Sequence, residues 1–227
     1  MRSNLLFLFI IISFIGYSQE ISKISFIKTN KLDSSKVKES VARIVRSSMM
    51  AEAMTNYQIN TDEDLEKAEK ALEPAIQVII PSMLETALKL EDENHTIGLK
   101  REDSIFYTYE EKDSIVLNQR KYSQEKYFVI RREEIREDQK IINGYNCYKV
   151  NYNYTPDSAV GDPGQTIFMF TTLSMYVTEE IKFLYHPIIK DNEILEKYYP
   201  LEIVRTMQLT RGKEDKYTLK ELEFFNN

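Results

Sequence analysis

The sequence predicts an α+β domain: a curved, mostly antiparallel β-sheet, a meander or half-barrel, with two to three N-terminal helices packed on it. Apolar residues recur at helical spacing between about residues 33 and 83, whereas from about residue 84 to residue 227 they mostly alternate with polar residues. The alternating runs follow one another closely, which is typical of antiparallel strands joined by short turns. No linker-like composition separates the two parts, so residues 19–227 are expected to form one domain.

Residues 1–18 have the features of a secretory signal peptide. Arg2 precedes an apolar run from Leu5 to Ile15, and small residues stand at Gly16 and Ser18. The run is shorter than the roughly 20 apolar residues that a membrane-spanning helix needs. We therefore expect cleavage near Ser18 and Gln19, and an exported protein that is soluble in the periplasm or outside the cell, without a membrane span.

The next part of the chain is expected to contain one strand and the helices. Alternation from Ile21 to Thr29 predicts the first strand, and a change to helical spacing predicts a helix from Ser34 to Tyr57. Thr61, which three acidic residues follow, is typical of a second helix start. Pro74 and Pro81 lack the N–H donor of a helix interior, so we expect either two short helices or one bent helix.

From Leu84 onward the period falls towards two, and a hairpin is predicted from Leu84 to Leu90 and around Ile97 and Leu99. Further strands are then predicted at Ser104 to Glu110, Ser114 to Leu117, Lys126 to Arg132, Tyr145 to Tyr154, Gln165 to Thr171 and Ser174 to Thr178. In the strand from Tyr145 to Tyr154, four alternate residues, Tyr148, Val150, Tyr152 and Tyr154, predict a buried face.

The C-terminal elements follow the clearest loop of the chain. Proline and glycine residues predict this loop between Thr155 and Gly164. Asp191 is a good N-cap for a short helix from Asn192 to Tyr198. A final hairpin is predicted from strands at Leu201 to Thr210 and Tyr217 to Phe224.

The composition argues against several function classes. The chain carries 36 acidic against 30 basic residues and a net charge of -6, which argues against binding to nucleic acid. One cysteine allows no intramolecular disulfide. We expect no metal and no cofactor, because the chain has two histidines and contains neither a zinc-protease helix pattern nor a phosphate-binding loop.

Cys147 and His186 form the one pair that could supply a thiol nucleophile and its base. A cysteine in a strand among aromatic residues is, however, more typical of a small buried hydrophobe. Carboxylates brought together by folding are the other route to a hydrolase. Adjacent acidic residues point to opposite faces of a strand, so a doublet such as Glu133 and Glu134 cannot form a catalytic pair by itself.

The segment from Ile141 to Val150, with Gly-Tyr-Asn-Cys-Tyr-Lys at its centre, resembles the I-x-GY-x-C-x-K-A segment of the GLPGLI family of exported Bacteroidetes proteins. Met175 to Ile181 resembles that family's Trp-Tyr-Thr-x-Glu-Ile segment. Leu195 to Ile203 falls where the namesake hexapeptide should be, but only one proline, one leucine and one isoleucine echo it. The chain thus resembles a divergent member or neighbour, from about Thr86 onward. The resemblance implies an exported, mostly antiparallel β protein and no established activity.

Three tripeptides resemble the Asp-Ser/Thr-apolar acceptor of O-glycosylation in the same phylum. They are Asp103-Ser104-Ile105, Asp113-Ser114-Ile115 and Asp157-Ser158-Ala159. The resemblance therefore implies Ser104, Ser114 and Ser158 as candidate sites of O-glycosylation.

The leading functional hypothesis is a non-enzymatic cell-envelope protein that binds or carries an apolar small molecule or a partner envelope protein on the curved sheet. Periplasmic lipoprotein carriers offer an analogy at the level of the fold alone. The alternatives are a hydrolase that uses Cys147 and His186 or assembled carboxylates, and a structural or assembly factor of the envelope that presents a strand edge or tyrosines. Nothing in the sequence distinguishes a filled core from a cavity. A helix from Ser34 to Tyr57 that filled the concavity would argue against a ligand.

Overall fold

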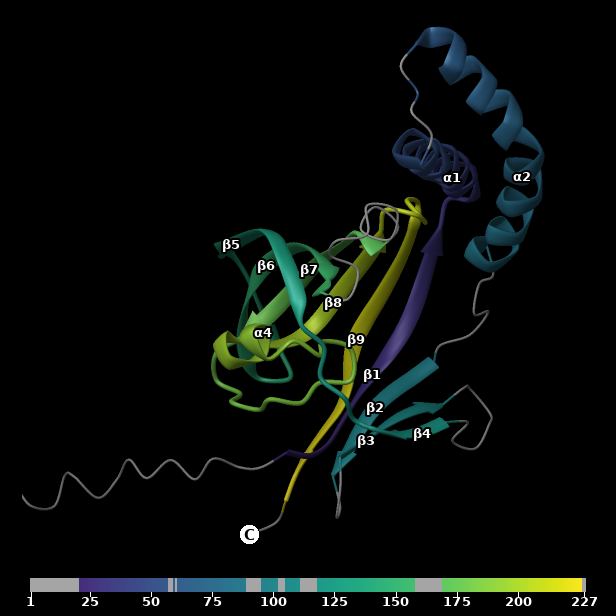
Figure 1. The fold of residues 1–227 in the computed structure, drawn as a ribbon. Coiled ribbons are helices and arrows are strands. Elements are labelled where there is room, and N and C mark those ends of the chain that lie inside the picture. Colours follow the sequence, from purple (N-terminus) through teal and green to yellow (C-terminus); the bar gives the residue numbers. More distant parts are fainter. Residues whose placement is uncertain are drawn as a thin grey trace, which may run out of the picture.

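A computed structural model describes residues 21–56, 59, 61–88, 95–101, 105–110, 118–157 and 169–225. Within these residues one sheet of nine antiparallel strands is accompanied by three helices (Figure 1). The predicted fold class, α+β with a curved antiparallel sheet, is confirmed. The expected signal peptide and its cleavage site lie outside the described residues.

The sheet has an almost uninterrupted up-and-down topology, with the order β4-β3-β2-β1-β9-β8-β7-β6-β5. Its strands are β1 (Ile21–Leu32), β2 (His95–Arg101), β3 (Ile105–Glu110), β4 (Asn118–Lys121), β5 (Tyr127–Ile142), β6 (Tyr145–Pro156), β7 (Thr171–Thr178), β8 (Tyr199–Met207) and β9 (Lys213–Phe224). Strands that follow each other in the chain are neighbours in the sheet, except that β1 pairs with β9 and that β4 and β5 form the two edges. The sheet is therefore an open half-barrel.

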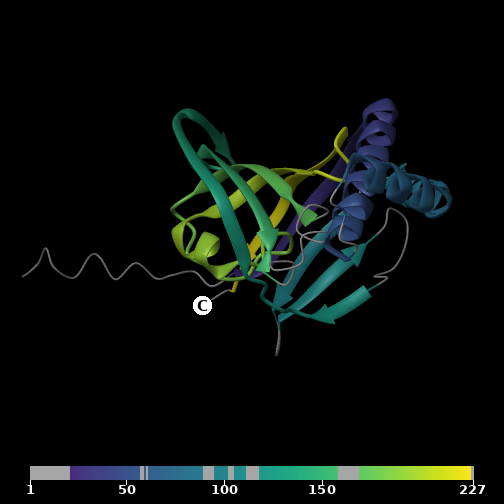
Figure 2. The same cartoon turned by 45° about the horizontal axis from the view of Figure 1, so that its top comes forward.

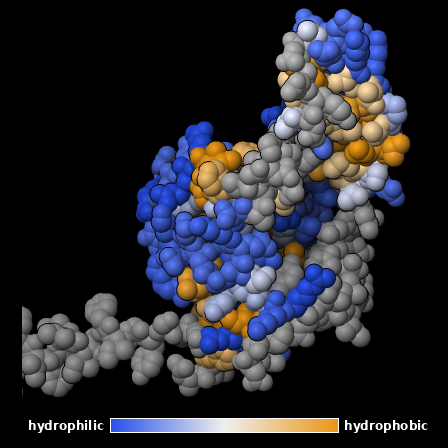
Figure 3. Space-filling model, viewed as in Figure 1, coloured by the Kyte–Doolittle hydropathy of each residue, from blue (hydrophilic) through white to orange (hydrophobic). Residues whose placement is uncertain are grey.

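Helices α1 (Ser34–Asn56) and α2 (Asp62–Leu88) form a hairpin that is inserted between β1 and β2. Figure 1 shows this hairpin against one end of the sheet, so α1 does not lie in the concavity. α2 is one curved helix that contains both Pro74 and Pro81, which is the bent-helix alternative. Hydrophobic residues gather over the helical hairpin on the face seen in Figure 3, whereas the side formed by β5 to β7 is mostly hydrophilic.

The predicted strand from Leu84 to Leu90 is wrong as far as Leu88, because α2 continues to that residue. The helical part therefore extends beyond the expected end near residue 83, and the next strand begins at His95. The reason is packing. Four residues of the last turns of α2 face a small core built on α1: Met83, Leu84, Ala87 and Leu88 pack with Val37, Val41 and Val45. Residues at this spacing lie on one face of a helix. The short alternation of apolar residues that predicted a strand falls in the same segment.

Most other elements are confirmed within a few residues. β5 is much longer than the predicted strand from Lys126 to Arg132, because its charged continuation pairs with β6 as far as the turn at Asn143 and Gly144. The predicted strand from Gln165 to Thr171 is wrong at Met169 and Phe170, since β7 begins at Thr171, and its residues 165–168 lie outside the described residues. The predicted strand from Ser114 to Leu117 lies outside the described residues.

The main core lies on the inner face of the curved sheet. The four residues predicted to share a buried face of β6 are between 0% and 8% exposed: Tyr148, Val150, Tyr152 and Tyr154. The segment 179–191 and helix α4 (Asn192–Lys197) contribute further core residues, among them Phe183, Ile189, Ile194 and Leu195. Figures 1 and 2 show the sheet curling around α4. Part of the half-barrel is thus filled by its own chain.

The helical hairpin is fixed to the sheet at the turn between β8 and β9. The Asp33 N–H donates to the carbonyl of Gly212 over 2.8 Å, and the Ser40 hydroxyl donates to the carbonyl of Gln208 over 2.7 Å. Gly212 has a φ of 109°, and a Cβ there would lie 2.7 Å from the Cβ of Lys36. Both the backbone angle and the close approach of α1 therefore require glycine.

We expect Gly212→Ala to lower the free energy of unfolding by about 3 kcal/mol, because left-handed strain adds to a clash with the first turn of α1. Gly144 provides the matched control: its φ is also positive, at 87°, but a Cβ there meets nothing within 4 Å. Gly144→Ala should cost only about 1 kcal/mol. Denaturant unfolding of both variants measures the difference, and equal losses would contradict a tight contact between α1 and this turn.

Candidate binding site on the inner face of the sheet

The segment 179–191 is held on the inner face by His186, which is fully buried. Its Nε2 lies 3.0 Å from the carbonyl oxygen of Pro200, and its Nδ1 accepts hydrogen bonds from the N–H groups of Ile188 and Ile189, each over 3.0 Å. Because Nδ1 accepts, the proton is on Nε2, which donates to Pro200. Burial lowers the pKa of His186 to about 3, so the ring is neutral at physiological pH.

The structure does not bring Cys147 and His186 together. Both ring nitrogens of His186 are bonded to backbone groups, whereas the Cys147 thiol lies 3.6 Å from the carbonyl oxygen of Tyr145. Burial raises the pKa of the Cys147 thiol to about 11, which disfavours a thiolate. These contacts are those of packing residues, as the aromatic surroundings of Cys147 in the sequence indicated.

Folding brings Glu134 and Glu179 together around Arg136, but this group is an exposed ion-pair network. Arg136 binds Glu134 over 3.1 Å and Glu179 over 2.9 Å. Hydrogen bonds from Tyr148 and Arg136 lower the pKa of Glu179, so it stays ionised near neutral pH. A general acid for glycoside cleavage needs the opposite shift.

The candidate glycosylation sites Ser104, Ser114 and Ser158 lie outside the described residues. Among the residues that are described, no group of three or more histidine, cysteine, aspartate or glutamate side chains is arranged to hold a metal ion. None of the helices in the same part of the chain contains a stretch of low charge and high mean hydropathy that could span a membrane.

A charged group does lie on the inner face, on β1, β8 and β9. Arg205 stands opposite Leu173 and Asp215 in the sheet, and Lys28 stands opposite Tyr217, so these side chains share the face of the buried Leu173. One Asp215 oxygen lies 2.8 Å from an Arg205 nitrogen, and the other lies 3.9 Å from the Lys28 ammonium. We call Lys28, Arg205 and Asp215 the inner-face cluster.

Arg205 remains a cation in this place. Burial disfavours its charge, but interactions with Tyr217 and Asp215 outweigh burial and raise the pKa of the guanidinium. Arg205 also lies over the ring of Tyr217, with 5.3 Å between the guanidinium carbon and the ring centroid.

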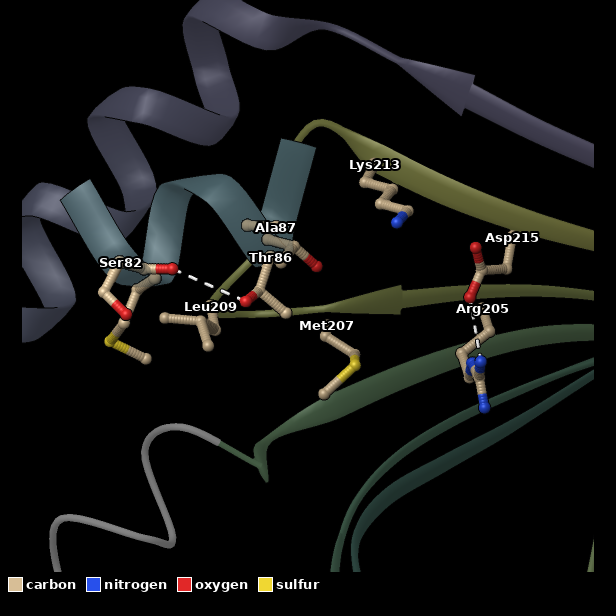
Figure 4. A pocket seen from close by; sticks show the side chains of 10 residues that line it. Ser82, Thr86, Ala87, Arg205, Met207, Leu209, Lys213 and Asp215 are labelled. Atoms are coloured by element: carbon tan, nitrogen blue, oxygen red, sulfur yellow. Dashed lines mark hydrogen bonds and ion pairs between the residues drawn. The ribbon is translucent and has the colours of Figure 1, made fainter. Parts of the chain in front are cut away.

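A cavity of about 370 Å³ separates the last turns of α2 from β8, β9 and their turn (Figure 4). Its apolar wall consists of Met83, Ala87, Met207 and Leu209. Arg205, Asp215 and Lys213 line it on the sheet side, and Ser82, Thr86 and Thr210 complete it. We call this space the α2 cavity.

A second cavity of about 330 Å³, the inner cavity, lies on the same face of the sheet. It is lined by Lys28, Ile97, Glu125, Tyr127, Tyr154, Leu173, Pro187, Ile188, Ile189, Lys190, Arg205 and Tyr217. Glu125 and Lys190 form an ion pair of 3.2 Å, and the rings of Tyr127 and Tyr154 are stacked with 4.0 Å between centroids. Arg205 lines both cavities and therefore stands between them.

Reasoning from the sequence missed the inner-face cluster, although one signal was present. Leu201, Ile203, Arg205 and Met207 alternate along β8, so an arginine occupies the apolar face of a strand. Comparisons with models of protein families, with curated proteins and with solved structures found no match for this chain.

The low pKa of His186 makes the stability of the protein depend on pH. In the unfolded chain the ring titrates near 6.5, so between pH 6.5 and about 3 the unfolded state binds the extra proton. The contribution is fully present above pH 6.5 and is lost as the pH falls. From pH 7 to pH 5 we expect the free energy of unfolding to fall by about 2 kcal/mol on this account.

Denaturant unfolding at several pH values measures this loss. His186→Gln, which keeps a donor and an acceptor but cannot titrate, should remove it, and His95→Gln should leave it in place. An unchanged pH dependence in the His186 variant would show that another group causes it.

Proposed function

We propose that this chain is a non-enzymatic binding protein that holds an apolar molecule in the α2 cavity. The observation that carries the proposal is the apolar wall of Met83, Ala87, Met207 and Leu209 around about 370 Å³ of space. Small-molecule sites are mostly apolar hollows of about 300 to 1,000 Å³ with a few polar groups, and the α2 cavity matches this description in size and lining.

The position of α1 supports the same proposal. α1 packs on the last turns of α2 through Val37, Val41 and Val45, beside the cavity residues Met83 and Ala87, and its own apolar side is used there. It does not enter the α2 cavity, whose helical wall comes from α2 alone. α1 therefore does not fill the concavity of the sheet, and it leaves room for a ligand.

We place this binding protein in the cell envelope, as an exported protein. The support is the signal-peptide pattern of residues 1–18. Expressed in a bacterium with an outer membrane, the protein should be recovered from the periplasm or the medium with Gln19 as its first residue. N-terminal sequencing and cell fractionation test this, and an intact Met1 form confined to the cytosol would refute it.

Binding can be tested with Nile red, an uncharged dye that fluoresces in apolar surroundings. Thr86 is exposed on α2 and lines the α2 cavity, so Thr86→Trp should occupy the space without disturbing the core. We expect this change to weaken dye binding by about tenfold or more. Glu85→Trp, at the exposed neighbouring position that does not line the cavity, is the matched control.

The control variant should bind the dye within about twofold of the unchanged protein. If the unchanged protein does not bind Nile red, or if both tryptophan variants bind it equally well, the proposal fails.

A further inference from the structure

We infer that the ligand of the α2 cavity is an anionic amphiphile, a molecule with one apolar chain and a carboxylate or phosphate head group that Arg205 binds. This inference rests on the proposed function and adds the charge of the ligand to it. It begins from the place of Arg205, which lines the α2 cavity on one side and the inner cavity on the other.

The lining of the two cavities is positively charged, unlike the chain as a whole. Its described residues include four cations, Lys28, Lys190, Arg205 and Lys213, and two carboxylates, Glu125 and Asp215. The whole chain has a net charge of -6. A cation excess on this face, in a protein with an acidic excess, favours an anion over a neutral or cationic ligand.

The two carboxylates are already engaged by cations of the same walls. Glu125 pairs with Lys190 over 3.2 Å. Asp215 is shared by two cations, with Arg205 at 2.8 Å and Lys28 at 3.9 Å. Arg205 and Asp215 lie at the end of the α2 cavity that is formed by the sheet (Figure 4).

Arg205 also has a hydrogen-bond donor that no described residue uses. Its terminal nitrogen binds Asp215, while its Nε is buried and has no hydrogen-bond partner in the described part of the chain. A buried N–H without an acceptor costs free energy, and an anionic oxygen would remove this cost. The guanidinium fork suits carboxylate and phosphate oxygens better than a single hydroxyl.

The apolar and charged parts of the α2 cavity are separate. Ala87 and Leu209 lie at the helix and the turn, and Arg205 and Asp215 lie farther along the strands (Figure 4). A chain along the apolar wall would bring its head group to Arg205. An amphiphile fits this arrangement better than a purely apolar ligand, because a purely apolar ligand would give the buried Nε of Arg205 no acceptor.

Competition against Nile red tests the inference with three molecules of equal chain length, used below their micelle concentrations: dodecanoate, dodecyl phosphate and 1-dodecanol. We expect at least one of the two anions to displace the dye at a concentration about tenfold lower than the alcohol. Preference for one anion identifies the head group, and equal preference indicates recognition of the charge. Competition by neither anion better than by the alcohol would overturn the inference.

Variants then assign the preference to Arg205. The double change Arg205→Gln with Asp215→Asn removes both partners of the pair, so no buried carboxylate is left without its cation. It should still bind Nile red but should reduce the preference for the anion to within about twofold. Lys216→Gln, which removes an exposed cation of β9 that binds Glu202 over 3.3 Å, should keep the full preference. A preference that survives the double change would overturn the role of Arg205.

If the double variant does not fold, a single variant still tests the inference. Lys213→Gln, at a partly exposed position of the α2 cavity, should weaken displacement by the anion and leave displacement by 1-dodecanol unchanged. Equal effects on both competitors would count against an anionic ligand. The two proposals remain separable: without Nile red binding both fail, whereas dye binding with no preference for an anion refutes only the charge of the ligand.

Discussion

The rest of the structure depends on the three hydrogen bonds of the buried His186. A segment without regular secondary structure runs through the inner face of the sheet from residue 179 to residue 191, where its backbone groups would otherwise have no partners. The imidazole binds two N–H groups of this segment and the carbonyl of Pro200 at the start of β8. Phe26 and Tyr199 enclose the ring, with centroids 4.8 and 5.1 Å away. The neutral ring thus fixes which part of the half-barrel is filled by protein.

The filled part and the hollow part have different physical characters. Both ring nitrogens of His186 have hydrogen-bond partners within the protein, and Phe26 and Tyr199 lie against the ring. At the inner-face cluster, two cations share Asp215, and Arg205 retains a buried donor. Charged groups on the inner face of a sheet carry a desolvation cost that apolar residues would avoid. A hydrophobic side chain in place of Arg205 would avoid this cost, and we attribute the charge to the proposed recognition of an anion.

Local signals allowed much of the fold to be predicted. The cap at Asp191 is present, since its carboxylate accepts the Ile194 N–H over 3.2 Å, and the carboxylate also binds the Tyr127 N–H over 2.7 Å. The helix that starts at Ser34 and the buried face of β6 follow equally from local periodicity. The end of α2 was predicted wrongly, because the short apolar pattern from Leu84 onward fits both a strand and a helix. Packing on α1 favours the helix.

The candidate site could not be predicted in this way, because it depends on distant segments. Arg205, Asp215 and Lys28 meet only through the register of β8 and β9 and of β9 and β1, and the last turns of α2 reach them only because the helical hairpin is fixed at Gly212. The Cys147 and His186 pair, suggested by residue type alone, is not brought together. The sequence shows which charged and nucleophilic side chains the chain contains, but the register of the strands determines which of them lie close together.

The pairing of β1 with β9 also governs how the chain can fold. Ile21 pairs with Phe224, so the first of the described strands to be synthesised can pair with β9 only after the last one has been made. Until then β1 can pair only with β2, and the two halves of the sheet, β1 to β4 and β5 to β9, remain unjoined. Contacts between such distant segments slow folding, since a long loop must close before they contribute free energy. The complete sheet therefore forms only after β9 has been synthesised.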